Sequence, residues 1–144
     1  MIGKVDNCNS LLYGISAYDT DRLQKFQNSC ACVIYKRKYE HVSVILRELH
    51  WLPSEARTYV KLLCCVYLSE LMVIRRESDL SLSVPRVFTR MGDRAFSVAG
   101  PRLWNALPVE IRKLDTLSKF KSQLKHLFFS SFQHYKLKVD IYRS

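Results

Sequence analysis

The stretch from Gly92 to Pro108 constrains the fold more than any other part of the chain, because it contains two of the four glycines and two of the four prolines. Gly92 tolerates a positive φ and therefore predicts a sharp turn. The pair Gly100 and Pro101 predicts a helix start, since a proline at the first helical position loses no hydrogen bond. Pro108 must end that helix and opens a short one over residues 109–112. We therefore expect short helices joined by tight turns in this stretch.

Three residues are expected to have structural roles. An apolar stripe at helical spacing passes through Trp104, so this indole should anchor the last helices to the core. Trp51 precedes a proline at a helix junction and is interpreted as a packing wedge. Asp93 should either order the turn at Gly92 or pair with an arginine.

Most of the remaining chain shows apolar residues at spacings of three and four, which predicts amphipathic helices. The expected helices cover residues 19–33, 44–49, 53–74 and 118–128. Three of them have polar candidates for the N-cap, namely Asp19 or Thr20, Ser43, and Ser118. Residues 7–16 fit either a short helix or an extended arm. Residues 129–144 have no clear period and are expected to form a frayed basic tail.

Residues 80–85 alternate apolar and polar side chains before a proline, and residues 87–89 could form a second strand. This pattern predicts a short β-hairpin near residues 80–90. The expected fold class is therefore mainly α, a small helical bundle with this hairpin.

The chain carries a formal charge of +10, and most of it lies in the second part. Residues 86–144 hold 12 Lys or Arg and 4 Asp or Glu, whereas residues 1–85 hold 11 and 9. Such a surplus is compatible with binding to phosphate backbones or acidic surfaces, and equally with a solvated surface. In the first part, Lys36, Arg37 and Lys38 lie between two tyrosines. This run is suited to phosphate contacts beside a stacking ring, or simply to offsetting a helix dipole.

The sequence disfavours several functional classes. The longest apolar run, residues 62–68, is far shorter than the roughly 20 residues of a membrane-spanning helix. Residues 1–6 lack the apolar segment of a secretory signal, so we expect an intracellular protein of the cytoplasm or nucleus. Five cysteines without framework spacing predict neither a disulfide scaffold nor a zinc site. A glycine-rich phosphate loop and a nucleophile elbow are missing, so we expect no enzymatic activity and no cofactor.

Several sequence blocks occur in the order found in the C-terminal part of LINE-type non-LTR retrotransposon reverse transcriptases, which this chain resembles. The signature block is Gly92-Asp-Arg-Ala-Phe-Ser97 followed by Pro101-Arg-Leu-Trp-Asn-Ala-Leu-Pro108. The supporting blocks are Cys8-Asn-Ser-Leu-Leu-Tyr-Gly14, Leu23-Gln-Lys-Phe-Gln-Asn28, Leu49-His-Trp-Leu-Pro53 and Ser118-Lys-Phe-Lys-Ser-Gln-Leu-Lys125. Together these blocks span nearly the whole chain.

The resemblance implies a non-catalytic region C-terminal to the palm of an RNA-directed DNA polymerase. Residues 1–75 would be a helical thumb-like segment, residues 76–128 the signature region with short strands and helices, and residues 129–144 the basic tail. The adjacent aspartates of the palm and the endonuclease are missing from the sequence. Such a region would hold RNA, or an RNA/DNA duplex of template and primer, by its backbone, without a membrane; the oligomeric state is not predicted.

The candidate nucleic-acid contacts are basic residues that we expect to share one face. They are Lys36, Arg37, Lys38, Arg90, Arg94, Arg102, Arg112, Lys113, Lys119 and Lys121.

The chain departs from the family pattern between Leu63 and Tyr67, where a helical hairpin's worth of residues is missing. A continuous helix there is expected to leave an apolar face without its partner. Two alternatives to the polymerase fragment stay open: a small host-encoded helical module for RNA or protein interaction, and a decayed remnant with no selected function.

Overall fold

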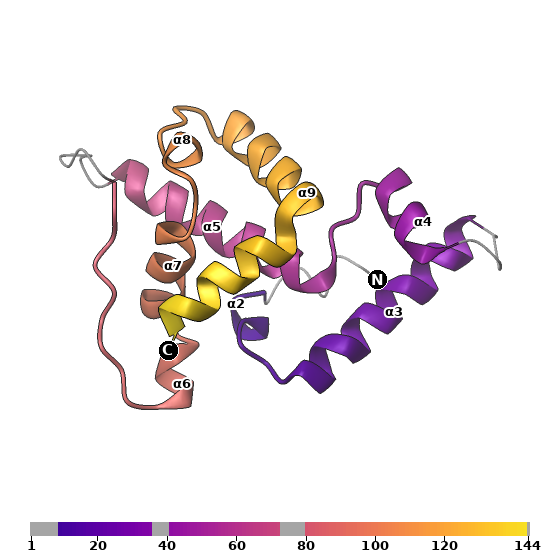
Figure 1. The fold of residues 1–144 in the computed structure, drawn as a ribbon, viewed down its shortest axis with the longest axis horizontal. Coiled ribbons are helices and arrows are strands. Elements are labelled where there is room, and N and C mark those ends of the chain that lie inside the picture. Colours follow the sequence, from indigo (N-terminus) through magenta and orange to yellow (C-terminus); the bar gives the residue numbers. More distant parts are fainter. Residues whose placement is uncertain (1–8, 36–40, 73–79, 144) are drawn as a thin grey trace.

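The computed structural model describes residues 9–35, 41–72 and 80–143, and every regular element in these ranges is a helix (Figure 1). The helices are α2 (Asn9–Leu12), α3 (Ala17–Tyr35), α4 (Val42–Glu48), α5 (Ser54–Met72), α6 (Arg90–Asp93), α7 (Phe96–Asn105), α8 (Val109–Arg112) and α9 (Leu117–Arg143). The prediction of a small helical bundle is confirmed. Of the two options for residues 7–16, a short helix is observed over the described part, in α2.

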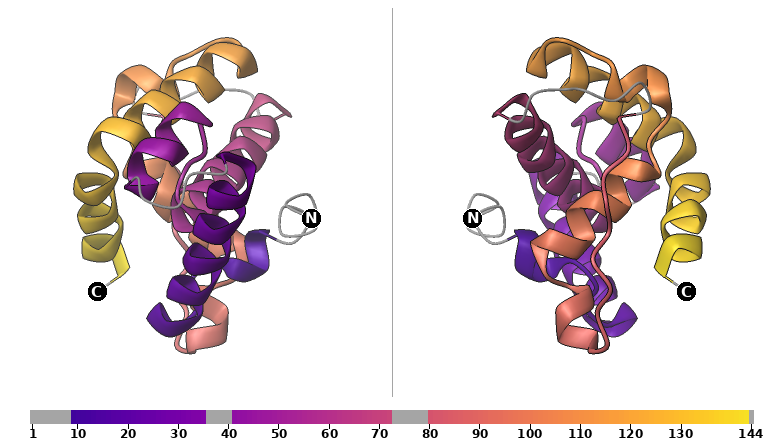
Figure 2. Two further views of the ribbon diagram at one scale, coloured as in Figure 1. Left: turned by 90° about the vertical axis from the view of Figure 1, so that its right-hand side faces the viewer. Right: turned by 90° about the vertical axis from the view of Figure 1, so that its left-hand side faces the viewer.

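Helix α5 runs through the middle of the bundle and packs against α2, α3, α7 and α9 (Figures 1 and 2). Its side chains Leu63, Val66 and Tyr67 are buried in the main core. The expectation that a continuous helix here would leave an uncovered apolar face is therefore wrong, because α7 and α9 cover that face.

Three aromatic rings hold α5, α7 and α9 together. Tyr67 and Phe120 stack with their ring centroids 4.4 Å apart, and Trp104 lies against Phe120 at 5.9 Å. Aromatic pairs at such distances add to the free energy gained by burying the rings. The Tyr67 hydroxyl also donates a hydrogen bond to the Leu114 carbonyl at 2.9 Å, which joins α5 to the segment before α9. Trp104 thus occupies the anchoring position expected for it.

Helix α7 approaches α5 closely at Gly100. A Cβ atom at this position would lie 2.8 Å from Cγ2 of Val66, so only glycine fits without a shift. The prediction that Gly100 and Pro101 begin a helix is wrong, because α7 already begins at Phe96 and contains Pro101 in its interior. Burial of Val98 and Ala99 in the first turns outweighs the backbone hydrogen bond that the proline cannot donate.

Gly92 does not form the predicted turn of positive φ, because it lies inside the short helix α6. The Thr89 hydroxyl accepts a hydrogen bond from the Gly92 N–H at 3.0 Å and caps this helix. A Cβ at Gly92 would lie 3.0 Å from that same hydroxyl oxygen, so a close approach, rather than an unusual backbone conformation, favours glycine here. Among the described glycines, the one with positive φ is Gly14, between α2 and α3.

The predicted β-hairpin near residues 80–90 is also wrong. The segment before α6 contains no strand, and side chains of α7 bind its backbone instead. The Trp104 indole donates to the Leu80 carbonyl at 2.7 Å. The Asn105 side chain accepts from the Leu82 N–H and donates to the Leu82 carbonyl, both at 2.8 Å. These bonds satisfy an extended backbone that would otherwise need a neighbouring strand.

Several helix boundaries differ from the predicted ones. Ser16 caps α3 by accepting from the Asp19 N–H, and its hydroxyl donates to the Asp19 carboxylate. Residue His41 precedes α4, so Ser43 lies inside that helix, and Ser118 lies inside α9 in the same way. The predicted end of α7 before Pro108 and the short helix after it are confirmed. Residues expected to form a frayed tail are helical to Arg143, after a break at Ser131.

Helix α4 packs on α3 through a second, smaller core. Ala31, Ile45 and Leu46 are buried there, and the half-buried Trp51 packs against them as the segment leaves α4. The Gln27 amide donates to the Leu52 carbonyl at 2.8 Å, which fixes the connection from α4 to α5. The exit of α4 is therefore held by both apolar and polar contacts.

Replacing Trp104 with alanine should lower the free energy of unfolding by roughly 3–5 kcal/mol, because the ring is 2% exposed and fills the centre of the aromatic cluster. Trp104→Phe retains ring packing but loses the bond to Leu80, so its cost should be smaller, about 1 kcal/mol beyond any repacking. Urea denaturation followed by circular dichroism measures both. Equal midpoints for the alanine variant and the unmodified chain would contradict this role.

Candidate nucleic-acid interface

Helix α9 separates apolar and basic side chains onto opposite sides. Phe120, Leu124 and Phe128 are fully buried, whereas Lys119 and Lys125 are exposed. This division follows from the helical period of 3.6 residues, which brings residues four apart onto one side. The chain has no Asp or Glu from residue 116 to residue 139. The exposed lysines of α9 consequently have no acidic neighbour one turn away on their own helix.

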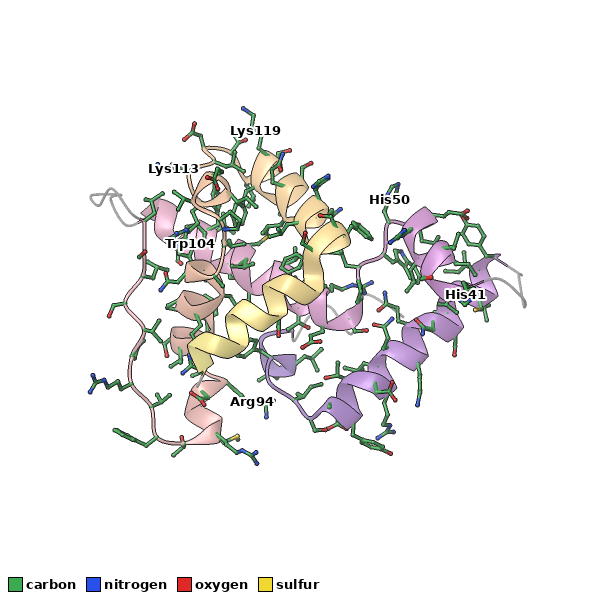
Figure 3. All side chains as sticks on the ribbon, in the orientation of Figure 1. His41, His50, Arg94, Trp104, Lys113 and Lys119 are labelled. Carbon is green, nitrogen blue, oxygen red and sulfur yellow. The ribbon has the colours of Figure 1, made fainter. Side chains whose placement is uncertain are left out.

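Lys113 extends this basic surface beyond the start of α9. It follows α8 and lies with Lys119 at the same end of the molecule (Figure 3). Within the described residues, Lys113, Lys119 and Lys125 form no salt bridge. We call these three residues the lysine surface. Their ammonium groups project into solvent and are not neutralised by the fold.

Lys121 lies on the flank of α9 that faces α5. Burial raises the pKa of the Cys64 thiol, and the nearby charge of Lys121 partly lowers that pKa again. Lys121 is exposed but sits close enough to α5 to act on this thiol, so it borders the lysine surface and does not belong to its centre.

Arg102 is buried and neutralised within the protein. Its Nη2 donates to Asp93 Oδ1 at 2.9 Å, and its side chain is only 9% exposed. The expectation that Asp93 pairs with an arginine therefore agrees with the observed contact. Arg102 cannot reach a phosphate in this conformation, which revises its assignment as a nucleic-acid contact.

Arg94 and Arg112 also serve the fold. Arg94 donates from Nε to the Tyr13 carbonyl at 2.9 Å and from Nη2 to the Leu11 carbonyl at 2.6 Å. These carbonyls lie at the end of α2, where backbone acceptors lack helical partners. Arg112 is buried and donates from Nη1 to the Ser81 hydroxyl at 3.3 Å. Both guanidinium groups join segments that are distant in sequence; Arg112 is buried, whereas Arg94 is half-buried.

The predicted contacts do not share one face. Arg90 is exposed on α6, which lies near Arg94 at the opposite end of the molecule from Lys113 and Lys119 (Figure 3). The run 36–38 lies outside the described residues. The predicted contacts did not include Lys125, although it lies one turn after Lys121 in a stretch without Asp or Glu.

Comparisons with protein-family models, with curated proteins and with solved structures found no match. Across the described ranges, no three His, Cys, Asp or Glu side chains are placed to hold a metal ion together. In the same ranges no helix combines the length and apolar character needed to cross a bilayer.

Replacing Asp93 with asparagine should cost about 3 kcal/mol of unfolding free energy, because it leaves the Arg102 guanidinium buried without its counter-charge. Asp21→Asn is the matched control, since Asp21 pairs with Lys25 at 2.7 Å on the exposed side of α3. An exposed pair of this kind is worth about 0.3–0.5 kcal/mol. Chemical denaturation of both variants measures the difference, and equal small losses would contradict a structural role for Arg102.

Proposed function

We propose that this chain is a helical module that binds nucleic acid by its phosphate backbone. The observation that carries the proposal is the lysine surface, Lys113, Lys119 and Lys125, which is exposed and unpaired within the described residues. It lies in or beside a stretch, residues 116–139, that contains no Asp or Glu. Lysines that neutralise phosphates release condensed counterions, which favours binding irrespective of sequence. The resemblance to the region after the palm of LINE-type reverse transcriptases supports the same function.

The core gives the lysine surface a fixed geometry. Phe120, Leu124 and Phe128 are each at most 2% exposed and seat α9 against α5 and α7. Lys119 and Lys125 are six residues apart, which corresponds to roughly 9 Å along a helix. The same spacing places the two side chains about 120° apart around the helix axis. Charges held on a rigid helix lose little conformational freedom of the backbone on binding, so they are suited to holding a duplex in place.

The role we propose is to hold nucleic acid, with the chemistry performed elsewhere. A polymerase needs paired carboxylates to bind two divalent ions, and this sequence contains no two adjacent aspartates. RNA or an RNA/DNA duplex is the partner that the resemblance favours.

A second candidate function is binding to another protein. Phe88 is 98% exposed and Met91 is 77% exposed, at the end of the molecule formed by α6. Exposed apolar side chains grouped in this way mark interaction surfaces. Binding through them would respond only weakly to salt, which distinguishes this candidate from phosphate binding.

A triple alanine variant of the lysine surface tests the main proposal. Binding of a fluorescein-labelled RNA/DNA duplex is measured by anisotropy across a range of salt concentrations. Removing three phosphate contacts should reduce the slope of log K against log salt by about 2–3, because each contact contributes about 0.9 to a duplex slope. Circular dichroism should show unchanged helix content, since these side chains are exposed.

The control variant replaces Arg22, Lys25 and Arg86, three other exposed basic residues, with alanine. Both triple variants lose three positive charges, so their net charge is the same. We expect it to retain the original slope. Equal effects of the two triple variants would show that only net charge matters, and an unchanged slope in the test variant would reject the lysine surface as the binding site.

A further inference from the structure

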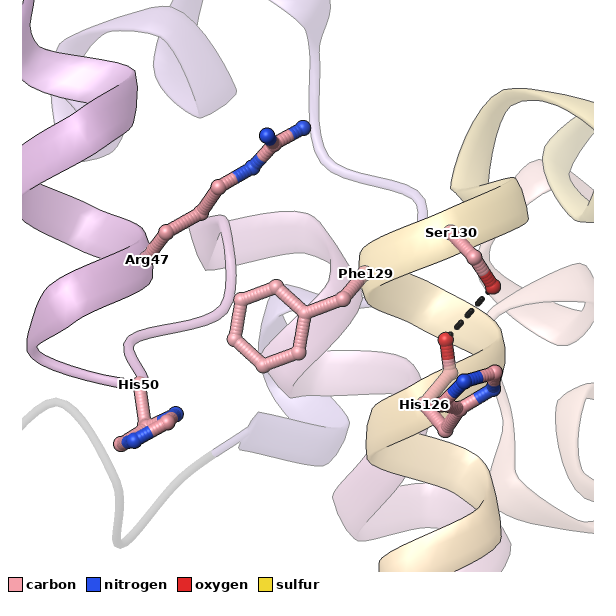
Figure 4. Close-up of a pocket in the computed structure, with 5 residues that line it drawn as sticks. All are labelled: Arg47, His50, His126, Phe129 and Ser130. Atoms are coloured by element: carbon pink, nitrogen blue, oxygen red, sulfur yellow. Dashed lines mark hydrogen bonds between the residues drawn. The ribbon is translucent and has the colours of Figure 1, made fainter.

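A cleft between the exit of α4 and helix α9 has a volume of about 280 Å³ (Figure 4). It is lined by Arg47, His50, His126, Phe129 and Ser130. The Phe129 ring projects from α9 toward Arg47 and His50 (Figure 4). No carboxylate of the described residues lines the cleft. The lining therefore combines one aromatic ring with groups that donate hydrogen bonds or carry positive charge, which is a chemistry suited to an anion attached to a flat ring.

His50 reaches the cleft from a backbone conformation that favours glycine. Its φ is 51°, and it follows the last turn of α4. The His50 N–H donates to the Arg47 carbonyl at 3.0 Å, and the Trp51 N–H donates to the Leu46 carbonyl at 2.8 Å. These two bonds form a Schellman motif, in which the residue with positive φ is usually glycine. A side chain placed there costs free energy relative to glycine, and strained residues of this kind gather at binding sites.

The residues that line the cleft are held in place by the two hydrophobic cores. Phe129 is partly buried and packs against the main core, while Trp51, next to His50, packs against the smaller core of α3 and α4. The Ser130 hydroxyl donates to the His126 carbonyl at 2.7 Å within α9. The cleft is therefore formed before any ligand arrives, which lowers the entropic cost of binding.

We propose that this cleft binds one unpaired nucleotide of RNA or DNA. The base stacks on Phe129, and the side chains of Arg47 and His50 contact the phosphate and the sugar from the α4 side of the cleft (Figure 4). Arginine forms a planar fork of donors that matches phosphate oxygens, and aromatic rings hold single-stranded bases irrespective of their identity. The volume lies just below the range of about 300–1,000 Å³ for drug-sized ligands, which suits a single nucleotide.

The inference rests on the proposed function, because the cleft continues the exposed side of α9. Lys125 directly precedes His126 in the chain, and both are exposed. A strand bound along the lysine surface would thus reach the cleft with one unpaired nucleotide. The lysine surface alone does not distinguish paired from unpaired nucleic acid, whereas the cleft requires a base that is not stacked in a duplex.

The test uses the full chain and two fluorescein-labelled probes, a 12-nucleotide uridylate strand and a strand of equal length made of abasic nucleotides. Phe129→Leu retains an apolar side chain against the core but removes the ring. It should weaken uridylate binding about tenfold, since stacking on one aromatic ring is worth roughly 1–3 kcal/mol per base, and leave abasic binding unchanged. Phe26→Leu, which alters an exposed phenylalanine of α3 outside the cleft, should change neither.

His50→Gly provides an independent test, because it removes the imidazole and relieves the positive φ. We expect an equal or higher melting temperature together with weaker binding of both probes. A purely structural His50 would give unchanged binding, and this result would overturn the proposal. Equal weakening of both probes by Phe129→Leu, or weakening by Phe26→Leu instead, would also overturn it. If the triple lysine variant weakens binding while the cleft variants do not, the proposed function stands and the cleft is rejected.

Discussion

The close contact between α5 and α7 is the constraint on which the rest of the fold depends. Gly100 allows Val66 to approach the α7 backbone, and this approach brings Trp104 beside Tyr67 and Phe120. Because Phe120 belongs to α9, the same aromatic cluster determines where α9 lies. The orientation of the lysine surface is therefore a consequence of how tightly two other helices pack.

The signature stretch, residues 92–108, holds several segments of the fold together through its polar side chains. Within the stretch, Arg102 binds Asp93. Arg94 binds the end of α2, and Trp104 and Asn105 bind the extended segment before α6. Hydrogen bonds to charged groups are worth more than neutral ones, and losing one partner leaves the other unsatisfied. The two arginines of this stretch, Arg94 and Arg102, thus explain the fold of the chain better than they explain nucleic-acid contact.

Helical periodicity predicted the fold class and a helix over residues 118–128, because burial on one side imposes a spacing that the sequence shows directly. The buried role of Arg102 could not be predicted in the same way, since its environment depends on Asp93 and on the packing of α7 against α5. The prediction of a hairpin near residues 80–90 was wrong for a related reason. Trp104 and Asn105 form the hydrogen bonds that a second strand was expected to form. The cleft at Phe129 could not be predicted from the sequence. It lies between the exit of α4 and α9, and local sequence patterns do not determine how two helices lie relative to each other.

Charge in this chain consequently has two distinct uses. The arginines of the signature stretch form contacts within the protein, whereas Lys113, Lys119 and Lys125 remain exposed on and beside α9. The formal charge of +10 overstates the surface that is open to phosphates, because Arg102 and Arg112 are buried. Nucleic-acid binding by this chain should therefore depend on position along α9 more than on total charge.

Backbone amide NMR of the full chain, titrated with a 12-nucleotide RNA strand, tests the central claim most directly. The account predicts that the largest chemical-shift changes fall in residues 119–130 of α9 and residues 47–51 at the exit of α4, while α3 and residues 86–96 change little. Dominant changes in residues 86–96, with α9 unaffected, would contradict it.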